Sequence, residues 1–341
     1  QLVALTTGQV RALSVSQVAG FGAARVQYLT TGQVASLSTA QVQALTTAEV
    51  AGLTSVQAAS LTTQQLAALT LVQVKALETG DLQALTTVQV GGLGSTQLQG
   101  MLTTQVSALT TEQVVVLTSA QALGLSALQI AALTTAQVAA LTTAQVSALA
   151  SVQVSALETV DIQALGSAQL LALETVDLQA LTTAQVRALQ TGQLVAFATG
   201  QVAALLPSQV SVLSSQQVSA LTTSQVVALG TQQVLALGTR QIPALTSVQT
   251  SSLTTVQLRV LSATQLGAFE TGDLQALTSA QVSAFGTDQI QLFPTTQLAM
   301  LTTGQVSVLT TGQVQALTTA GLSALTTSQL VALTTGQVRA L

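Results

Sequence analysis

The segment LTTAQVAAL, Leu133 to Leu141, contains the pattern from which the whole chain is built. Its last eight residues, Thr-Thr-Ala-Gln-Val-Ala-Ala-Leu, recur with small changes along all 341 residues. Residues 1–5 are the end of one repeat, and the remaining 336 residues divide into 42 octapeptides without insertion or deletion. Because a fixed short period is the signature of a repeat architecture, we expect residues 1–341 to form one continuous array without a domain boundary.

The eight positions of the consensus, Thr-Thr-x-Gln-Val-x-Ala-Leu, differ in how strictly they are kept. Position 8 is always large and apolar, with 36 Leu, five Phe and Met101, and position 4 is Gln in 35 of 42 octapeptides. Position 5 is Val, Leu or Ile in 39, the exceptions being Ala58, Ala122 and Thr250. Six of the seven basic residues stand at positions 3 and 6: Arg11, Lys75, Arg187, Arg240, Arg259 and Arg339. We expect positions 5 and 8 to be buried and positions 3 and 6 to face solvent.

These spacings favour a helix over a strand. Residues three apart lie on one side of a helix but on opposite faces of a strand, and both the buried pair and the exposed pair are three apart. A continuous helix is excluded, because eight residues are about 2.2 turns and an apolar stripe would rotate by roughly 80° per repeat. We therefore predict an all-α solenoid, or superhelix, in which each octapeptide forms one short helix.

Positions 1 and 4 supply the signal that starts each helix. Thr at position 1 with Gln at position 4 has the spacing of a capping box, and the preceding Leu and following Val have the spacing of a hydrophobic staple. Pro207, at position 2, would be the first helical residue, where proline is favoured. Pro243, at position 6, would remove a backbone hydrogen bond, so we expect its octapeptide to be distorted.

A β-solenoid is the alternative fold. Thr and Val favour strands, and an even period keeps the alternation of a strand in phase from one repeat to the next. The abundance of Leu, Ala and Gln, and the lack of regularly placed turn glycines, favour the helical solenoid.

One octapeptide cannot fold by itself. Burial of one Val and one Leu contributes about 1.5–3 kcal/mol each, whereas ordering eight residues costs on the order of 12 kcal/mol. Stability must come from stacking the repeats, as in other solenoids, so we expect function to reside in the assembled surface.

The composition argues against several classes of protein. The chain has no Cys, His or Trp, and therefore no disulfide, no thiolate and none of the commonest metal ligand. Its 7 basic residues are dispersed and its net charge is −4, which does not suit nucleic acid. Although the mean hydropathy is +0.61, polar residues interrupt every apolar run, so we expect no membrane span.

Four variant octapeptides carry two acids, in the pattern Glu-Thr-x-Asp-(Leu/Ile)-Gln-Ala-Leu. The pairs, which are candidate cation sites, are Glu78 with Asp81, Glu158 with Asp161, Glu174 with Asp177, and Glu270 with Asp273. Acids three apart on a helix repel, and a bound cation such as Ca²⁺ would explain keeping them together. Copying of one variant octapeptide within the array explains them as well. Since two carboxylates fall short of the six to eight oxygens that Ca²⁺ prefers, we favour copying and predict no metal site.

No catalytic residues stand out. The acid pairs lack the surrounding residue types of a glycosidase site, and the many Ser and Thr hydroxyls have no His to activate them. One octapeptide departs most from the consensus, with Gly22, Arg25 and Tyr28 at positions 1, 4 and 7, and we interpret it as degenerate. We expect no enzyme activity and no cofactor.

The run LTTAQVAAL of Leu133 to Leu141 resembles the tandem LTTxQ octapeptide arrays of very long secreted or surface proteins of Gram-negative bacteria. The resemblance covers the whole chain. It implies an extracellular, secreted or cell-surface array, and it brings no catalytic residue. Because the chain starts and ends within the pattern, we expect a part of a longer polypeptide.

Two functions follow as hypotheses. The first is a structural protein that self-associates as a homo-oligomer into an extracellular filament, sheath or adhesin stalk, since a surface with few charges repels its copies little. The second is a binding surface in which rows of Thr hydroxyls contact ice or a polysaccharide. The first predicts that the hydroxyls at position 1 are used as helix caps, and the second predicts that Thr side chains project from a flat open face.

Overall fold

The computed structural model describes residues 1–341 and contains 41 short α-helices, one 3₁₀ turn (η1, Leu2–Ala4) and no strand. Forty-one of the 42 octapeptides contain one α-helix each. The predicted all-α solenoid with one helix per repeat is confirmed, and the β-solenoid alternative is wrong. The helices have four to six residues, and none has the length and apolar composition needed to cross a bilayer.

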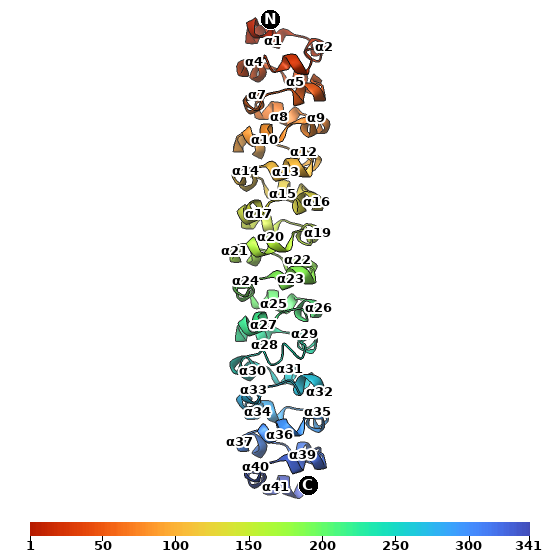
Figure 1. Ribbon diagram of the computed structural model, residues 1–341, viewed down its shortest axis with the longest axis vertical. Coiled ribbons are helices and arrows are strands. Elements are labelled where there is room, and N and C mark those ends of the chain that lie inside the picture. The colour runs from red at the N-terminus through yellow and green to blue at the C-terminus, as the bar shows by residue number, and fades with distance from the viewer. The chain divides into compact units, whose positions relative to one another are not determined.

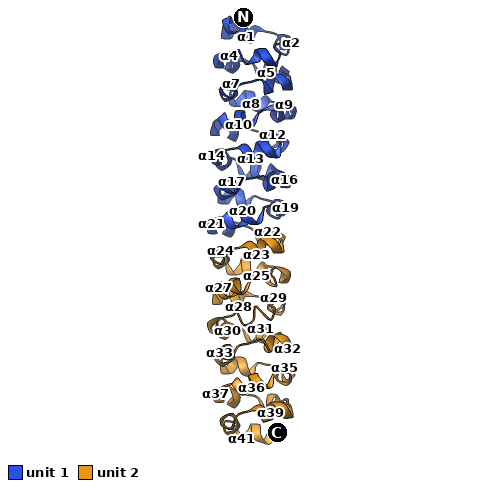
Figure 2. Cartoon of the chain, in the orientation of Figure 1, with its two compact units in different colours: residues 1–173 blue, residues 174–341 orange.

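The chain divides into two compact units, residues 1–173 and 174–341, and the division falls between two octapeptides of the sequence (Figure 2). The helices of the first unit are α1 Thr7–Ala12, α2 Val15–Val18, α3 Ala23–Val26, α4 Thr31–Ser36, α5 Thr39–Ala44, α6 Thr47–Ala51, α7 Ser55–Ser60, α8 Thr63–Ala68, α9 Leu71–Ala76, α10 Thr79–Ala84, α11 Thr87–Gly91, α12 Ser95–Gly100, α13 Thr103–Ala108, α14 Thr111–Val115, α15 Ser119–Gly124, α16 Ala127–Ala131, α17 Thr135–Ala140, α18 Thr143–Ser147, α19 Ser151–Val154, α20 Thr159–Ala164 and α21 Ser167–Leu171.

The second unit is built in the same way. Its helices are α22 Thr175–Ala180, α23 Thr183–Ala188, α24 Thr191–Ala196, α25 Thr199–Ala204, α26 Pro207–Val210, α27 Ser215–Ala220, α28 Thr223–Ala228, α29 Thr231–Leu235, α30 Ser247–Ser252, α31 Thr255–Arg259, α32 Ala263–Leu266, α33 Thr271–Ala276, α34 Ser279–Ser283, α35 Thr287–Leu292, α36 Thr295–Met300, α37 Thr303–Ser307, α38 Thr311–Gln315, α39 Thr319–Ala324, α40 Thr327–Val331 and α41 Thr335–Ala340.

Each helix occupies up to six residues, from position 2 to position 7, and two extended residues separate it from the next. In α17, Thr134 is the N-cap at φ −72°, ψ 153°, and Leu141 ends the helix at φ −55°, ψ 136°. The Thr134 hydroxyl accepts from the Gln137 N–H, and the Gln137 side chain accepts from the Thr134 N–H. The predicted capping box is therefore confirmed, and it recurs wherever Thr or Ser stands at position 1 with Gln at position 4.

Within each unit the chain coils, so that most helices pack against the helix that lies three octapeptides further along. In the first unit α7 packs against α4 on one side and α10 on the other, and Figure 1 shows these three helices stacked one below the other. In the second unit α33 packs against α30 and α36. One turn of the solenoid therefore takes between three and four octapeptides.

The core lies inside this coil and is made from positions 5 and 8. Apart from the last turn of the array, these side chains are at most 7% exposed, except Leu5 and Leu13 near the start. All five Phe residues and Met101 are buried at position 8, where Phe285 and Phe293 meet edge to face with their ring centres 5.2 Å apart. Positions 3 and 6 are mostly exposed, as predicted, and so are the six basic residues that they carry.

Pro207 and Pro243 behave as the sequence predicts. Pro207 is the first residue of α26. The octapeptide that contains Pro243, Gly238 to Leu245, is the only one without a helix, because proline cannot donate the backbone hydrogen bond that a helix needs there. It keeps its buried Ile242 and Leu245, so the distortion stays local.

Thr250 is the one polar residue at position 5. Its side chain is 0% exposed, and its hydroxyl has no hydrogen-bond partner. We predict that Thr250→Val stabilises the protein by about 1–2 kcal/mol, because it removes a buried unsatisfied hydroxyl at nearly constant volume. The same change at position 1 of that octapeptide, Thr246→Val, should destabilise by about 1 kcal/mol, because it removes a helix cap. Urea unfolding measures both, and a destabilised Thr250→Val variant would contradict this account of the core.

Candidate functional site

The most regular polar feature of the array is the buried side chain at position 4. Gln113, which is 2% exposed, accepts a hydrogen bond from the Thr110 N–H at 2.9 Å through its oxygen. Its amide nitrogen donates to the carbonyl oxygens of Leu82 at 2.7 Å and Leu85 at 2.8 Å. We call this arrangement the glutamine clasp, since one side chain joins the start of its own helix to residues 28 and 31 positions earlier in the chain.

The clasp does not need a hydroxyl at position 1. The N–H groups of Ala150, Leu206 and Gly230 each donate to the Gln of their own octapeptide, at 2.7, 2.8 and 2.6 Å. The amide of Gln233 also donates to the carbonyls of Val202 and Leu205 in the preceding turn. The Gln therefore keeps its role where the cap residue has changed.

A glutamine suits this place because it must both accept and donate. The carbonyl at position 8 lies on extended backbone, outside any helix, and needs a donor from another part of the chain. Gln9 and Gln17 belong to the first turn of residues 1–341 and have no earlier turn within these residues to stack on. Both complete their capping boxes only, and both are exposed. Burial of the Gln thus depends on the stacked turn. The octapeptide pattern predicts the capping box but not the hydrogen bonds from the Gln amide to the earlier turn.

Acids replace Gln at position 4 in five octapeptides. Of these acids, Glu49, Asp81 and Asp273 each accept a hydrogen bond from a donor in the earlier turn. Glu49, 1% exposed, accepts from the Gly22 N–H at 2.6 Å as well as from its own Thr46 N–H. Gly22 has a φ of 76°, which favours glycine, and its own octapeptide has Arg25 in place of the Gln that would accept this N–H. The octapeptide interpreted as degenerate is therefore completed by Glu49.

The acid-pair octapeptides use a side-chain donor instead. Asp81 accepts from the Ser55 hydroxyl, and Asp273 accepts from the Ser247 hydroxyl, both at 3.0 Å and both across 26 residues. Asp161 is hydrogen-bonded in the same way by Thr135. The Leu53 carbonyl, which would meet a Gln amide if residue 81 were Gln, receives no hydrogen bond from Asp81, because an ionised carboxylate cannot donate.

The structure separates the two acids of each pair. Asp81, Asp161, Asp177 and Asp273 are 2–5% exposed, whereas Glu78, Glu158, Glu174 and Glu270 are exposed N-cap residues. No group of three or more acids gathers anywhere in the chain. That the acid pairs form no metal site stays a prediction from the sequence.

Burial has an electrostatic consequence for the aspartates. It raises the pKa of Asp81, Asp161 and Asp273 above the usual value of 3.8, although the hydrogen bonds from Ser55, Thr135 and Ser247 act in the opposite direction. The neighbouring Glu of the same pair raises each pKa further. The exposed Glu112 differs, because a hydrogen bond from its own backbone lowers its pKa.

The aspartates also reveal a longer period. Asp81, Asp177 and Asp273 are 96 residues, or 12 octapeptides, apart, and Ser55, Ser151 and Ser247 are separated by the same interval. Ser55 and Ser247 are the hydroxyl donors to Asp81 and Asp273. Copying of a block of 12 octapeptides accounts for this interval and preserves such contacts, which span more than three octapeptides.

Pro294 shows what happens when the clasp loses its N–H donor. Proline has no N–H, so the oxygen of Gln297 is buried without a hydrogen-bond partner, while its amide still donates to the Phe269 carbonyl at 3.1 Å. A buried unsatisfied acceptor costs about 1–3 kcal/mol.

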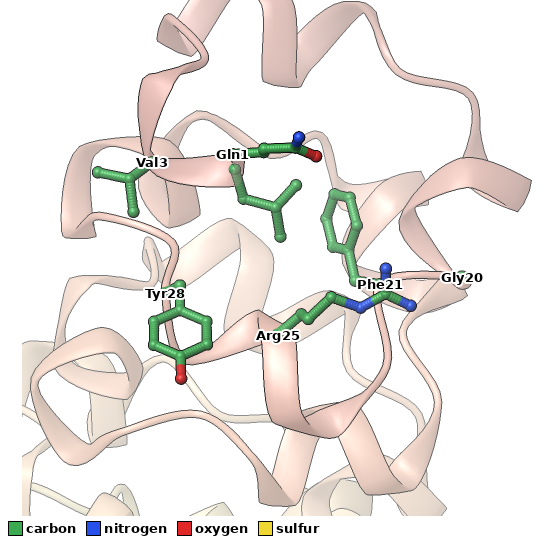
Figure 3. Close-up of a pocket in the computed structure, with 7 residues that line it drawn as sticks. Gln1, Val3, Gly20, Phe21, Arg25 and Tyr28 are labelled. Carbon is green, nitrogen blue, oxygen red and sulfur yellow. The ribbon is translucent and has the colours of Figure 1, made fainter.

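A cavity of about 490 Å³ lies beside the octapeptide that carries Arg25 and Tyr28. Figure 3 shows Arg25 extending toward Phe21, whereas the Tyr28 hydroxyl points away from the cavity. The other residues that line the cavity are Gln1, Leu2, Val3 and Gly20, and none of them places an acid or a nucleophile beside Arg25. The arrangement offers no combination of acid and base for catalysis.

Short capped helices that stack three to four octapeptides apart, each joined to the earlier turn by a buried side chain, define a helical solenoid of the repeat-protein class. The ALTTAQ repeat family matches residues 2–39, 34–71, 74–111, 170–206, 266–303 and 306–341, which together cover well over half of the chain. The chain therefore belongs to the ALTTAQ repeat family. Three of these matches begin 96 residues apart, at residues 74, 170 and 266. A search of curated proteins finds no match.

We predict that Gln113→Glu destabilises the array by about 3 kcal/mol. The carboxylate still accepts from the Thr110 N–H but cannot donate to the Leu82 and Leu85 carbonyls, which lose their side-chain donor. The control is Gln9→Glu, which removes no such bond and should cost less than about 0.5 kcal/mol. Equal losses in urea unfolding would contradict the role of the clasp.

We also predict a pH dependence. A raised pKa in the folded state means that the aspartates contribute fully to stability below their unfolded pKa, and that this contribution is lost as pH rises through the folded pKa. The double variant Asp81→Asn/Asp273→Asn should therefore be more stable than the parent protein at pH 7.5 and lose this advantage near pH 4.

Urea midpoints across this pH range measure the effect. The control is Asp288→Asn, at an exposed position 3, which should follow the pH dependence of the parent protein. Parallel curves for the parent protein and the double variant would contradict the prediction.

Proposed function

We propose that this protein is a structural array that self-associates into an extracellular filament, sheath or adhesin stalk. Repeat-family membership and a repetitive helical architecture support a structural role rather than a catalytic one. The extracellular location rests on the resemblance to secreted and surface arrays. Self-association rests on the exposed surface of the octapeptides.

One observation carries the proposal: large apolar side chains stand exposed at position 3. Nine of them are 50–75% exposed, namely Val56, Val72, Val88, Leu128, Val152, Val160, Val176, Val248 and Val256. Positions 4, 5 and 8 are already buried between repeats, so these side chains have no role in the fold. Exposed apolar surface that recurs along an array favours covering by a partner, and many weak contacts add up through avidity.

The low charge of the surface supports a second copy as that partner. The chain has 7 basic and 11 acidic residues among 341, so two arrays experience little like-charge repulsion when they approach each other. Identical repeats also present the same surface many times, which allows one contact to be repeated along both chains.

The alternative, a row of Thr hydroxyls for ice or polysaccharide, has less support. The hydroxyls of Thr110 and Thr222 at position 1 accept from the N–H groups of Gln113 and Gln225, as in the other capping boxes with Thr at position 1. The hydroxyls at position 1 are therefore used for capping, as the structural hypothesis predicts.

Electron microscopy and sedimentation velocity of the purified protein test the proposal. We expect concentration-dependent assembly into filaments, and we expect the triple variant Val56→Glu/Val152→Glu/Val248→Glu to remain folded but to assemble poorly, because it places charge on the apolar surface. A monodisperse monomer at all concentrations would contradict self-association.

The matched control adds the same charge at the same position of other octapeptides. Gln64, Gln216 and Gln232 are exposed polar residues at position 3, so Gln64→Glu/Gln216→Glu/Gln232→Glu should reduce assembly much less. Equal effects of the two triple variants would show that net charge, and not the apolar side chains, controls assembly. Surface labelling of intact cells that produce the full natural protein tests the location.

A further inference from the structure

A cleft of about 550 Å³ in the second unit collects positive charge. Its lining includes Arg187, the segment from Ser211, after α26, to Ser215, the first residue of α27, and the segment Gly238 to Gln241. Arg187 is at position 6 of its octapeptide and Arg240 is at position 3 of the octapeptide that Pro243 distorts. Two of only seven basic residues in the chain therefore line one cleft.

Neither arginine is neutralised by the protein. Both are exposed, no hydrogen bond or ion pair from either guanidinium group is found, and no acid lines the cleft. Arg187 and Arg240 are 53 residues apart, and no other two basic residues of the chain have this separation. The pairing is thus a local exception in the array and does not follow from the repeat.

The distorted octapeptide fixes one side of the cleft. Gly238 to Leu245 has no helix, and its Arg240 carbonyl accepts a hydrogen bond from the Ser215 hydroxyl at 3.1 Å. This bond joins the backbone of Arg240 to the first residue of α27. The cleft is therefore built from three segments of the chain, each held by packing or hydrogen bonds.

Hydroxyl groups complete a set of donors. The Ser214 hydroxyl accepts from the Gln217 N–H, which leaves its own proton available, and the Thr239 hydroxyl makes no hydrogen bond within the protein. A guanidinium group presents several N–H donors in a planar fork that suits phosphate, sulfate and carboxylate oxygens. The cleft therefore offers two guanidinium groups and two hydroxyl protons as donors, and it contains no carboxylate that would repel an anion.

We propose that this cleft binds a tetrahedral oxyanion, sulfate or phosphate, either free or as an ester on a larger molecule. The anion lies between Arg187 and Arg240 and accepts from their guanidinium groups and from the Ser214 and Thr239 hydroxyls. The site goes beyond the structural role, since assembly through the exposed apolar side chains at position 3 does not require anion binding.

Equilibrium dialysis of the whole chain with radiolabelled inorganic sulfate and inorganic phosphate, at constant ionic strength, tests the site. We expect one saturable anion per chain and loss of this binding in Arg187→Gln/Arg240→Gln. The matched control is Arg11→Gln/Arg339→Gln, which removes the same charge from exposed positions outside the cleft and should leave the binding unchanged.

A sulfated oligosaccharide distinguishes the source of the anion. Competition with labelled sulfate at a much lower concentration than free sulfate would assign the cleft to an ester on a glycan, and equal competition would assign it to the free ion. No saturable binding of either inorganic anion, or equal loss of binding in the two double variants, would overturn the proposal. Assembly measured on the same proteins separates this outcome from failure of the structural role.

Discussion

The hydrogen bonds of the buried glutamine at position 4 are the constraint on which the rest of the array depends. Helices of four to six residues are too short to persist by themselves, and each one leaves the carbonyl of its last, extended residue without a donor inside the octapeptide. Gln113 resolves both problems, because one amide group caps its own helix and donates to Leu82 and Leu85 of the earlier turn. The apolar side chains at positions 5 and 8 drive the stacking, and the amide fixes its register.

The exceptions follow the same physical rule. An amide at position 4 can meet carbonyls, but a carboxylate has to meet donors, and Glu49 meets the Gly22 N–H while Asp81 meets the Ser55 hydroxyl. Where the rule fails, an atom is left unpaired, as at Gln297 below Pro294. Substitutions in the array are therefore coupled across about 26 to 28 residues, and copying of a block of 12 octapeptides keeps the coupled residues together.

Much of the fold follows from the octapeptide, since the spacing of Val138 and Leu141, the Thr134–Gln137 box and the distortion at Pro243 were all predictable from local chemistry. The partner of the glutamine was not predictable, because nothing within eight residues encodes a contact 28 residues away. A signal was present nonetheless. Gln is kept in 35 octapeptides, whereas Thr or Ser at position 1 is kept in only 26, so capping alone does not explain the glutamine.

Candidate sites follow a different logic from the fold. The sequence directed attention to Glu78 and Asp81, which look like a functional pair, yet the structure uses the buried Asp81 to join two turns and leaves Glu78 as an exposed cap. The sequence does not predict that Arg187 and Arg240 line one cleft, because 53 residues separate them and each alone is an ordinary exposed cation. In a coiled array, proximity is set by the turn of the solenoid, so chemistry that differs from the repeat has to be sought at separations near one or two turns and not within an octapeptide.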